Sequence, residues 1–213
     1  MQRIIIFANG ELPNLSKALT ILRNDDFVIC ADGGTRLAHA LGFQPRFIIG
    51  DMDSTDKEVL KKFQEADVEI ELYPRDKSET DLELAMQKAI GLNPTEIIIV
   101  AALGGRMDQT IANIALLSNL QHGTFNIKLD DGVEEIFFIQ NQGKIQGRSG
   151  DIVSLIPWGN PVHGVQTQNL KWHLNNETLY PNKTRGISNE MTSDTASIKT
   201  TSGLLLVVHT RNS

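Results

Sequence analysis

The sequence lacks the features that mark secreted, membrane-spanning or zinc-binding proteins. Its only cysteine is Cys30, so no intrachain disulfide can form, and no Cys/His cluster has the spacing of a zinc site. No apolar run approaches the roughly 20 residues that a membrane-spanning helix needs. The apolar part of the opening segment, MQRIIIFANGELP, is too short for a signal peptide. We therefore expect a cytoplasmic protein without a membrane segment.

A basic surface is also missing. The net charge is -6, and the stretch from Asp51 to Glu83 contains twelve acidic and five basic residues, so the rest of the chain is close to neutral. Proteins that bind nucleic acid usually carry a basic patch, and we expect no nucleic-acid partner here. The acidic stretch is either a solvated face or a group of carboxylates that holds a divalent cation.

Short apolar runs rich in β-branched residues alternate with helical patterns over the first two thirds of the chain, as in βαβα folds. Predicted strands cover residues 3–8, 27–31, 46–50, 68–73 and 96–102. Predicted helices cover residues 15–22, 35–41, 57–65, 80–90 and 109–120. Several strands are apolar at consecutive positions, which is typical of parallel strands covered on both faces. The pattern predicts a parallel, Rossmann-like α/β domain over residues 1–141.

The pattern changes after residue 141. Seven glycines separate short apolar runs such as DIVSLIPW and LLLVVHT, and no helical period appears. Short strands separated by turn residues are typical of small antiparallel sandwiches and barrels. We predict an all-β domain, most simply a sandwich, over residues 142–213.

Polar turns follow four of the predicted strands. Open parallel sheets bind ligands at the carboxyl ends of their strands, near the point where the strand order reverses. Asp32 follows one strand in ADGG, Asp51 and Asp53 follow the next, and Asp81 ends the turn DKSETD. The fourth turn, GGRMDQ, covers residues 104–109. We expect the four turns to line one edge of the sheet.

Asp51 and Asp53 are the strongest candidates for a metal site. Two carboxylates this close at a partly buried edge repel each other unless a cation or several donors compensate them. Oxygen ligands near a nucleotide suit Mg²⁺ better than zinc. The Gly-Lys-Ser/Thr string of a P-loop is absent, so a nucleotide would be held in another way.

The other turn residues allow a structural and a functional interpretation. Gly33 and Gly34 either supply a positive φ or let backbone N–H groups approach a phosphate. Lys77 and Arg106 either hold phosphate oxygens or form surface ion pairs. The residues alone leave both interpretations open.

Some of these residues can also be helix caps. Asp108 is placed to cap the helix that follows the GGR turn. Ser78 with Asp81, or Thr80 with Glu83, fits a capping box at the start of the preceding helix. For these residues too, the sequence alone does not decide between a helix cap and a contact with a ligand.

Seven short strings resemble those of the thiamine pyrophosphokinase family, in the same order and spacing. They are ADGG, IIGDMDS, DKSETDLELA, GGRMDQTIANI, VSLIPWG, LKWHL and GISNE, and they span nearly the whole chain. The resemblance implies a thiamine diphosphokinase, which transfers the diphosphoryl group of ATP to the hydroxyl of thiamine and gives thiamine diphosphate and AMP, with Mg²⁺ required. It also implies a homodimer with thiamine at the subunit interface.

The resemblance implies roles for individual residues. Catalytic and metal-binding positions are matched by Asp51, Asp53 and Asp81. Positions around the nucleotide are matched by Asp32, Gly33, Gly34, Lys77, Thr80, Arg106 and Asp108. Positions on the thiamine side are matched by Trp172, Ser188 and Asn189. An indole can hold the rings of thiamine by stacking and cation–π attraction; without the resemblance, Trp172 would be assigned to the core, as Trp158 is.

The chain departs from the family pattern at two positions. Gln109 stands where histidine is frequent, and glutamine can hydrogen-bond but cannot titrate. Asn169 stands where glycine is frequent.

Two other functions fit parts of the pattern. A pyrophosphokinase for another small alcohol, such as a hydroxymethylpterin, would not need LKWHL and GISNE. A non-catalytic sensor of nucleotide or thiamine would tolerate loss of the metal carboxylates. The presence of Asp51, Asp53 and Asp81 together argues against a sensor.

Overall fold

The computed structural model describes residues 2–119 and 125–212 and divides the chain into two compact units. The first unit extends to Gly132 apart from a short segment that begins at Leu117, and the second unit consists of this segment and the chain from Val133 onward. The functional division expected after residue 141 stays a prediction. None of the helices in the described residues is long and apolar enough to cross a membrane.

Strands alternate with helices in the described part of the first unit. The strands are β1 (Arg3–Phe7), β2 (Phe27–Ala31), β3 (Phe47–Gly50), β4 (Glu69–Leu72), β5 (Glu96–Val100) and β6 (Asn126–Asp130). The helices are α1 (Leu15–Ile21), α2 (Gly34–Ala40), α3 (Lys57–Glu65), α4 (Asp81–Gly91) and α5 (Met107–Ser118). All ten predicted elements are present with bounds close to those predicted; the predicted end of the last helix, Leu120, lies outside the described residues.

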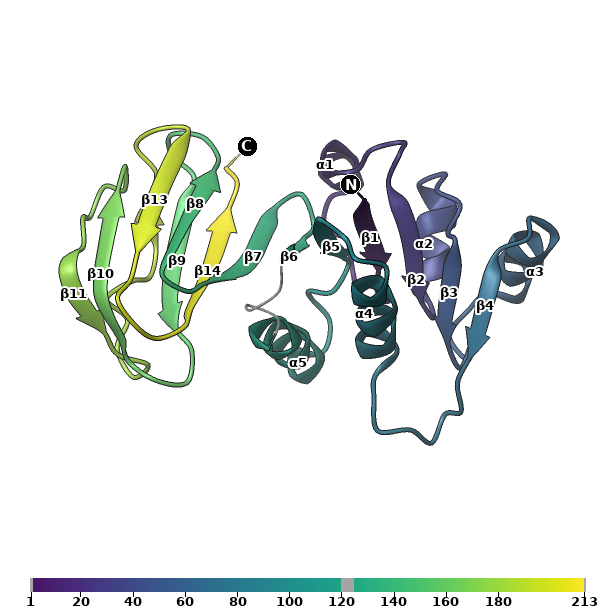
Figure 1. Cartoon of the computed structure of the whole chain (residues 1–213). Helices are drawn as coiled ribbons and strands as arrows, with labels where there is room; N and C mark the ends of the chain where they lie inside the picture. Colours follow the sequence, from purple (N-terminus) through teal and green to yellow (C-terminus); the bar gives the residue numbers. More distant parts are fainter. Residues whose placement is uncertain (1, 120–124, 213) are drawn as a thin grey trace. The chain divides into compact units, whose positions relative to one another are not determined.

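The strands of the first unit form a parallel sheet in the order β6-β5-β1-β2-β3-β4. Strand β1 lies inside this sheet, because the chain first builds outward to β4 and then returns to add β5 on the other side of β1 (Figure 1). The strand order therefore reverses between β1 and β5. Open α/β sheets bind ligands at the carboxyl ends of the strands at this position.

Helices cover both faces of this sheet, which explains why its strands are apolar at consecutive positions. Ile5, Cys30 and Ile48 pack with residues of α1, α2 and α3 on one face. Ile4 and Ile6 alternate with Ile5 along β1, so they point to the opposite face, and both are fully buried. Helix α4 covers this face (Figure 1). The predicted parallel α/β fold is confirmed.

The second unit is a sandwich of two antiparallel sheets, with strand orders β12-β9-β14-β7 and β11-β10-β13-β8. Its strands are β7 (Glu134–Ile139), β8 (Gln142–Gln146), β9 (Ile152–Pro157), β10 (Val162–Gln168), β11 (Asn175–Leu179), β12 (Asn189–Glu190), β13 (Thr195–Lys199) and β14 (Leu205–Thr210). Alternate residues such as Val153, Leu155, Leu205 and Val207 point inward and share one apolar core with the other sheet. The predicted sandwich is confirmed.

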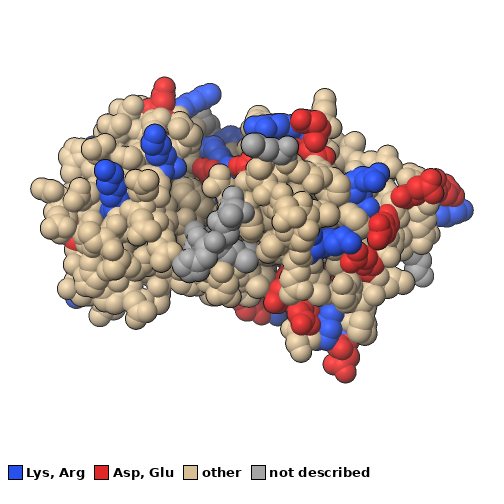
Figure 2. Space-filling model, viewed as in Figure 1, with Lys and Arg blue, Asp and Glu red and all other residues tan. Residues whose placement is uncertain are grey.

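Acidic side chains are concentrated on the first unit. On the face drawn in Figure 2, Asp and Glu gather where α3 and the loop before α4 lie, whereas the second unit shows mostly uncharged surface. This agrees with the acidic stretch found in the sequence between Asp51 and Glu83. The net negative charge therefore belongs mainly to the unit with the parallel sheet.

Candidate active site

A cavity of about 570 Å³ opens at the carboxyl ends of the strands of the first unit. Its lining includes Asp32 after β2, Asp53 after β3, residues 79–82 at the start of α4, and residues 104–106 after β5. All four predicted turns thus contribute to one cavity. The cavity lies where the strand order reverses, and its volume is in the range of small-molecule sites.

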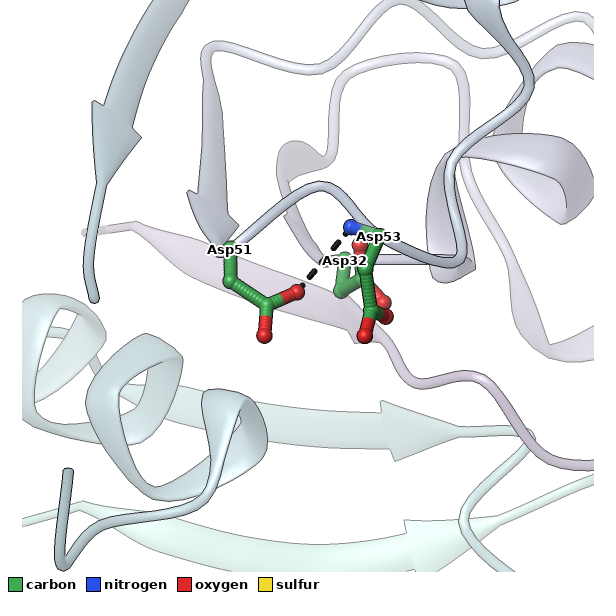
Figure 3. Close-up of side chains that lie close together, drawn as sticks. All are labelled: Asp32, Asp51 and Asp53. Atoms are coloured by element: carbon green, nitrogen blue, oxygen red, sulfur yellow. Dashed lines mark hydrogen bonds between the residues drawn. The ribbon is translucent and has the colours of Figure 1, made fainter. Parts of the chain in front are cut away.

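Three aspartates converge at this cavity. Asp32, Asp51 and Asp53 each offer one carboxylate oxygen, and these oxygens all lie within 4.8 Å of one another (Figure 3). Asp32 is buried, Asp51 is half-buried and Asp53 is exposed. The sequence predicted a metal role for Asp51, Asp53 and Asp81 and a nucleotide role for Asp32, and Asp81 is not part of this group. The structure adds Asp32 to the group of carboxylates that could hold a cation.

The turn after β3 explains how Asp53 lines the cavity while Asp51 lies close to it. Met52, between them, has a φ of 61°, a left-handed conformation that is uncommon for a residue with a side chain. Its side chain packs against the apolar core. The N–H of Asp53 donates to Oδ1 of Asp51 at 3.0 Å and closes the turn (Figure 3). Unusual backbone conformations of this kind concentrate at functional sites.

Asp32 is fixed by its neighbours. Its φ is 41°, and its Oδ1 accepts a hydrogen bond from Oγ1 of Thr55 at 3.0 Å. The glycines that follow are explained by close packing rather than by a positive φ. A Cβ on Gly34 would lie 2.0 Å from the carbonyl oxygen of Phe7, and Gly33 has a φ of -61°. The two glycines therefore allow the turn to pack tightly against β1.

Asp81 lies beside the three aspartates and is paired with a lysine. Its Oδ1 is 2.9 Å from Nζ of Lys77. Burial raises the pKa of Asp81 above its ordinary value, helped by the charges of Asp32 and Asp51 and opposed by the hydrogen bond from Lys77. Burial alone would lower the pKa of Lys77, but the three carboxylates outweigh it and raise that pKa. Negative charge therefore exceeds positive charge around this lysine, as expected of a site that accepts a further cation.

The remaining predicted nucleotide residues have partners within the chain. Thr80 is the N-cap of α4, and its Oγ1 accepts from the N–H of Glu83 at 3.2 Å. Nε of Arg106 donates to Oδ1 of Asp108 at 3.1 Å, which raises the pKa of Arg106 and lowers that of Asp108. Asp108 lies in the first turn of α5, which begins at Met107, and not at its cap. Nucleotide contacts of these residues stay predictions.

The loop after β1 also lines the cavity, and the sequence did not single it out. Residues 9–11 belong to this loop. The N–H of Gly10 donates to the carbonyl oxygen of Ala101 at 2.7 Å, and a Cβ on Gly10 would lie 2.3 Å from that oxygen. The side chain of Asn9 lies against Gly33. The loop is therefore held between the turns after β2 and β5. This position follows from the order of the strands in the sheet and could not be predicted from the local sequence.

The predicted thiamine-side residues lie together in the second unit. Trp172 is 51% exposed, so it is not a core residue, whereas Trp158 packs edge-on against Phe138 with ring centres 5.4 Å apart. The side-chain amide of Asn189 is hydrogen-bonded to the backbone N–H and carbonyl of Trp172. Ser188, next to Asn189, has a φ of 57°. The structure thus brings the three predicted residues to one place, and their contacts with a ligand stay predictions.

The two departures from the family pattern have clear positions in the structure. Asn169 has a φ of 60°, which asparagine tolerates better than most residues. Its Nδ2 donates to the carbonyl oxygen of Thr195 at 2.8 Å, and its carbonyl accepts from the N–H of Thr192 at 3.0 Å. Asparagine therefore preserves the left-handed turn before Trp172 that glycine would make. Gln109 lines the cavity of the first unit.

Comparisons with known proteins agree over both units. The family model described as thiamin pyrophosphokinase, catalytic domain, matches residues 18–129, and the model described as thiamin pyrophosphokinase, vitamin B1 binding domain, matches residues 139–205. The chain belongs to the thiamin pyrophosphokinase family. The family expected from the seven sequence strings is confirmed.

Individual relatives match most or all of the chain. Thiamine pyrophosphokinase of Bacillus subtilis (strain 168) is 28% identical over 211 residues, which cover 98% of each chain. Thiamine pyrophosphokinase 1 of Oryza sativa subsp. japonica is 26% identical over 86% of this chain and 79% of the rice protein. The crystal structure of the B. subtilis protein has a TM-score of 0.90 at 24% identity, with 100% of both chains covered. Thiamin pyrophosphokinase from Candida albicans has a TM-score of 0.82 at 15% identity, with coverage of 99% and 89%. These structures share the two-part fold.

Proposed function

We propose that this protein is a thiamine diphosphokinase, which transfers the diphosphoryl group of ATP to the hydroxyl of thiamine and releases AMP. One observation carries the proposal beyond family membership. Asp32, Asp51 and Asp53 converge at the cavity where the strand order reverses, and Lys77 and Arg106 line the same cavity. A cavity with both carboxylates and basic side chains suits a nucleotide whose phosphates are bound together with a metal ion.

The residues of this cavity fit Mg²⁺. The donor set consists of carboxylate oxygens, which hard divalent cations prefer, and contains neither cysteine nor histidine. We propose Asp51, Asp53 and Asp81 as the metal-binding residues, with Asp32 close enough to share in binding. When bound, Mg²⁺ supplies positive charge that offsets the negative charge of the transferring phosphoryl groups.

The chain's own residues position the reactants. Lys77, held by its ion pair with Asp81, and the exposed Arg106 supply positive charge for the phosphate oxygens of ATP. The remaining residues that we propose to bind the nucleotide are Asp32, Gly33, Gly34, Thr80 and Asp108.

Diphosphoryl transfer depends mainly on placement and electrostatic stabilisation. The hydroxyl oxygen of thiamine bonds to the β-phosphorus of ATP, and the bond from that phosphorus to the bridging α-phosphate oxygen breaks. The bridging oxygen leaves with AMP. We propose that an aspartate of the cluster accepts the hydroxyl proton, because no other group of the predicted site is as suitable a base at neutral pH.

We propose that Trp172, Ser188 and Asn189 form the thiamine side of the active site, at the interface of a homodimer, with the indole of Trp172 in contact with thiamine. An exposed indole is suited to stack on a flat ring. A pyrophosphokinase for another alcohol is not favoured, because the vitamin B1 binding model matches the second unit.

Product analysis tests this proposal. The purified protein is incubated with ATP, Mg²⁺ and thiamine, and the products are measured by mass spectrometry, with parallel reactions that contain EDTA or replace thiamine with a hydroxymethylpterin. We expect thiamine diphosphate and AMP in equal amounts, only with metal and only with thiamine. Formation of ADP with thiamine monophosphate, or of product from the pterin alone, would contradict the proposal.

A further inference from the structure

The side-chain amide of Asn189 is committed to the backbone of its neighbours. The N–H of Trp172 donates to Oδ1 of Asn189 at 3.0 Å, and Nδ2 of Asn189 donates to the carbonyl oxygen of Trp172 at 2.7 Å. The N–H of Glu190 donates to the same Oδ1 at 2.9 Å. Asn189 is only 4% exposed. Both acceptor positions of the amide oxygen are therefore used within the chain, and the amide is poorly placed to contact a ligand.

These hydrogen bonds extend a short antiparallel ladder. Leu170 forms a bridge with Met191, and the N–H of Lys171 donates to the carbonyl oxygen of Glu190 at 2.9 Å. At the next position the side chain of Asn189 takes the place of a backbone partner. The amide of Asn189 therefore fixes the backbone at the point where the ladder ends.

Trp172 extends from this fixed backbone into solvent. Nζ of Lys171 lies 5.0 Å from the centre of the Trp172 ring and 2.9 Å from Oε2 of Glu190, so a tethered cation lies over the indole. The indole is nevertheless largely accessible, because Trp172 as a whole is 51% exposed. An exposed aromatic side chain on a fixed backbone is a preorganised binding surface, since little conformational entropy is lost when a ring stacks on it.

We infer that Asn189 is a positioning residue that acts on the substrate through Trp172. The inference rests on the proposed function, because it takes the flat ring of thiamine as the ligand of the indole. The amide of Asn189 fixes the backbone of Trp172, and the indole makes the contact with thiamine. Loss of the amide loosens the indole and weakens thiamine binding, while binding of ATP in the first unit is unaffected.

Kinetics of Asn189→Ala test the effect on the substrate. Two hydrogen bonds to Trp172 are lost, so we expect the KM for thiamine to rise about tenfold and the KM for ATP to change by less than about twofold. Asn189→Asp should act in the same direction, because a carboxylate oxygen would replace the donor that faces the carbonyl of Trp172. The matched control is Asn182→Ala, an exposed asparagine of the same unit whose side chain makes no hydrogen bond to the described residues.

Fluorescence tests the positioning role without turnover. The chain has two tryptophans, so Trp158→Phe leaves Trp172 as the only indole. In this background we expect Asn189→Ala to lower the fluorescence anisotropy of ligand-free Trp172 and Asn182→Ala to leave it unchanged. If the protein made no thiamine diphosphate, the proposed function would fail, but the anisotropy would still decide the role of Asn189.

Two outcomes would overturn the inference. An increase in the KM for thiamine with unchanged anisotropy would mean that Asn189 contacts the substrate directly. A fall in the unfolding temperature, with equal increases in the KM for thiamine and for ATP, would mean that Asn189 only supports the fold.

Discussion

Carboxylates gather in both units of this protein, but their partners differ. In the first unit, Asp32, Asp51 and Asp53 meet at an open cavity. The cations that line this cavity are Lys77, which is paired with a fourth carboxylate, the exposed Arg75, 3.6 Å from Asp53, and Arg106, which is paired with Asp108. The carboxylates there outnumber the cations that the described residues provide.

In the second unit, two carboxylates lie on either side of a fully buried histidine. Nε2 of His209 is 3.0 Å from Oδ2 of Asp151, and Nδ1 is 3.1 Å from Oε2 of Glu135. Asp151 also accepts hydrogen bonds from the N–H groups of Arg148 and Asn212. Burial alone would raise the pKa of Asp151, but the hydrogen bonds from His209 and these N–H groups outweigh it and lower that pKa.

The two groups of carboxylates differ in how completely they are paired, and this difference distinguishes a binding site from a structural contact. Buried carboxylates that receive a full set of hydrogen bonds stabilise the fold, and removal of a partner is expected to destabilise it. Carboxylates that converge at a cavity with too few partners leave charge to be compensated by a ligand. The same residue type thus has a structural role in one unit and a proposed catalytic role in the other.

The largest effect is expected for His209→Gln. It removes the imidazole that lies between the buried Asp151 and the half-buried Glu135, so the free energy of unfolding should fall by about 3 kcal/mol. Urea unfolding measures the change. His163→Gln is the control, because His163 is an exposed histidine of the same unit, and its loss should change the free energy by less than about 0.5 kcal/mol. Equal losses in both variants would show that the buried contact does not stabilise the fold.

Asp51→Asn should have nearly as large an effect, but on turnover. We expect kcat to fall about 100- to 1,000-fold, as when a preorganised electrostatic group is removed from an active site. The free energy of unfolding should not fall, because one repelling charge is removed from the cluster. Asp67→Asn is the control: Asp67 is exposed and has a φ of 57°, a conformation that asparagine also tolerates. Normal turnover by Asp51→Asn would remove Asp51 from the proposed site.

The pH dependence of stability should also reveal the structural carboxylate. The pKa of Asp151 in the folded protein lies below the value of about 3.9 in an unfolded chain. Its contribution to stability is therefore present above about pH 4 and is lost as the pH falls through the folded-state pKa. We expect the free energy of unfolding to fall more steeply in this acidic range for the wild type than for Asp151→Asn. Parallel pH profiles, measured by urea unfolding, would contradict this role.

The smallest effect is expected at Asn169. Asn169→Ala loses the hydrogen bond to Thr195 and places alanine at a φ of 60°, so the free energy of unfolding should fall by about 2 kcal/mol. Asn169→Gly loses the same hydrogen bond without the conformational strain and should cost about 1 kcal/mol. Thermal unfolding would compare the two. A glycine variant less stable than the alanine variant would contradict the importance of the left-handed turn.

The fold of both units could be predicted from local sequence patterns. Buried parallel strands such as β1 and β5 are continuous β-branched runs, and their helices carry apolar residues at helical spacing. Strands β6 and β7 were not predicted. The β6 sequence, NIKLD, has only two apolar residues, and a short apolar run such as that of β7 does not by itself distinguish strand from helix.

The candidate site could be predicted only where its charged residues are close together in the sequence. Asp51 and Asp53 stand together in the sequence, so their repulsion could be inferred directly. The place of Asp32 beside them depends on the pairing of β2 with β3, and the loop after β1 faces the cavity only because the strand order reverses there. The buried contact of His209 could not be predicted from the sequence, because its partners Glu135 and Asp151 are distant in sequence.

The central claim is that the clustered aspartates of the first unit bind a divalent cation. Calorimetric titration of Mg²⁺ tests this claim most directly. The wild type, Asp51→Asn and Asp67→Asn are titrated in the presence of a non-hydrolysable ATP analogue. We predict saturable Mg²⁺ binding to the wild type and to Asp67→Asn, and a loss of this binding in Asp51→Asn. The same binding curve for all three proteins would contradict the claim.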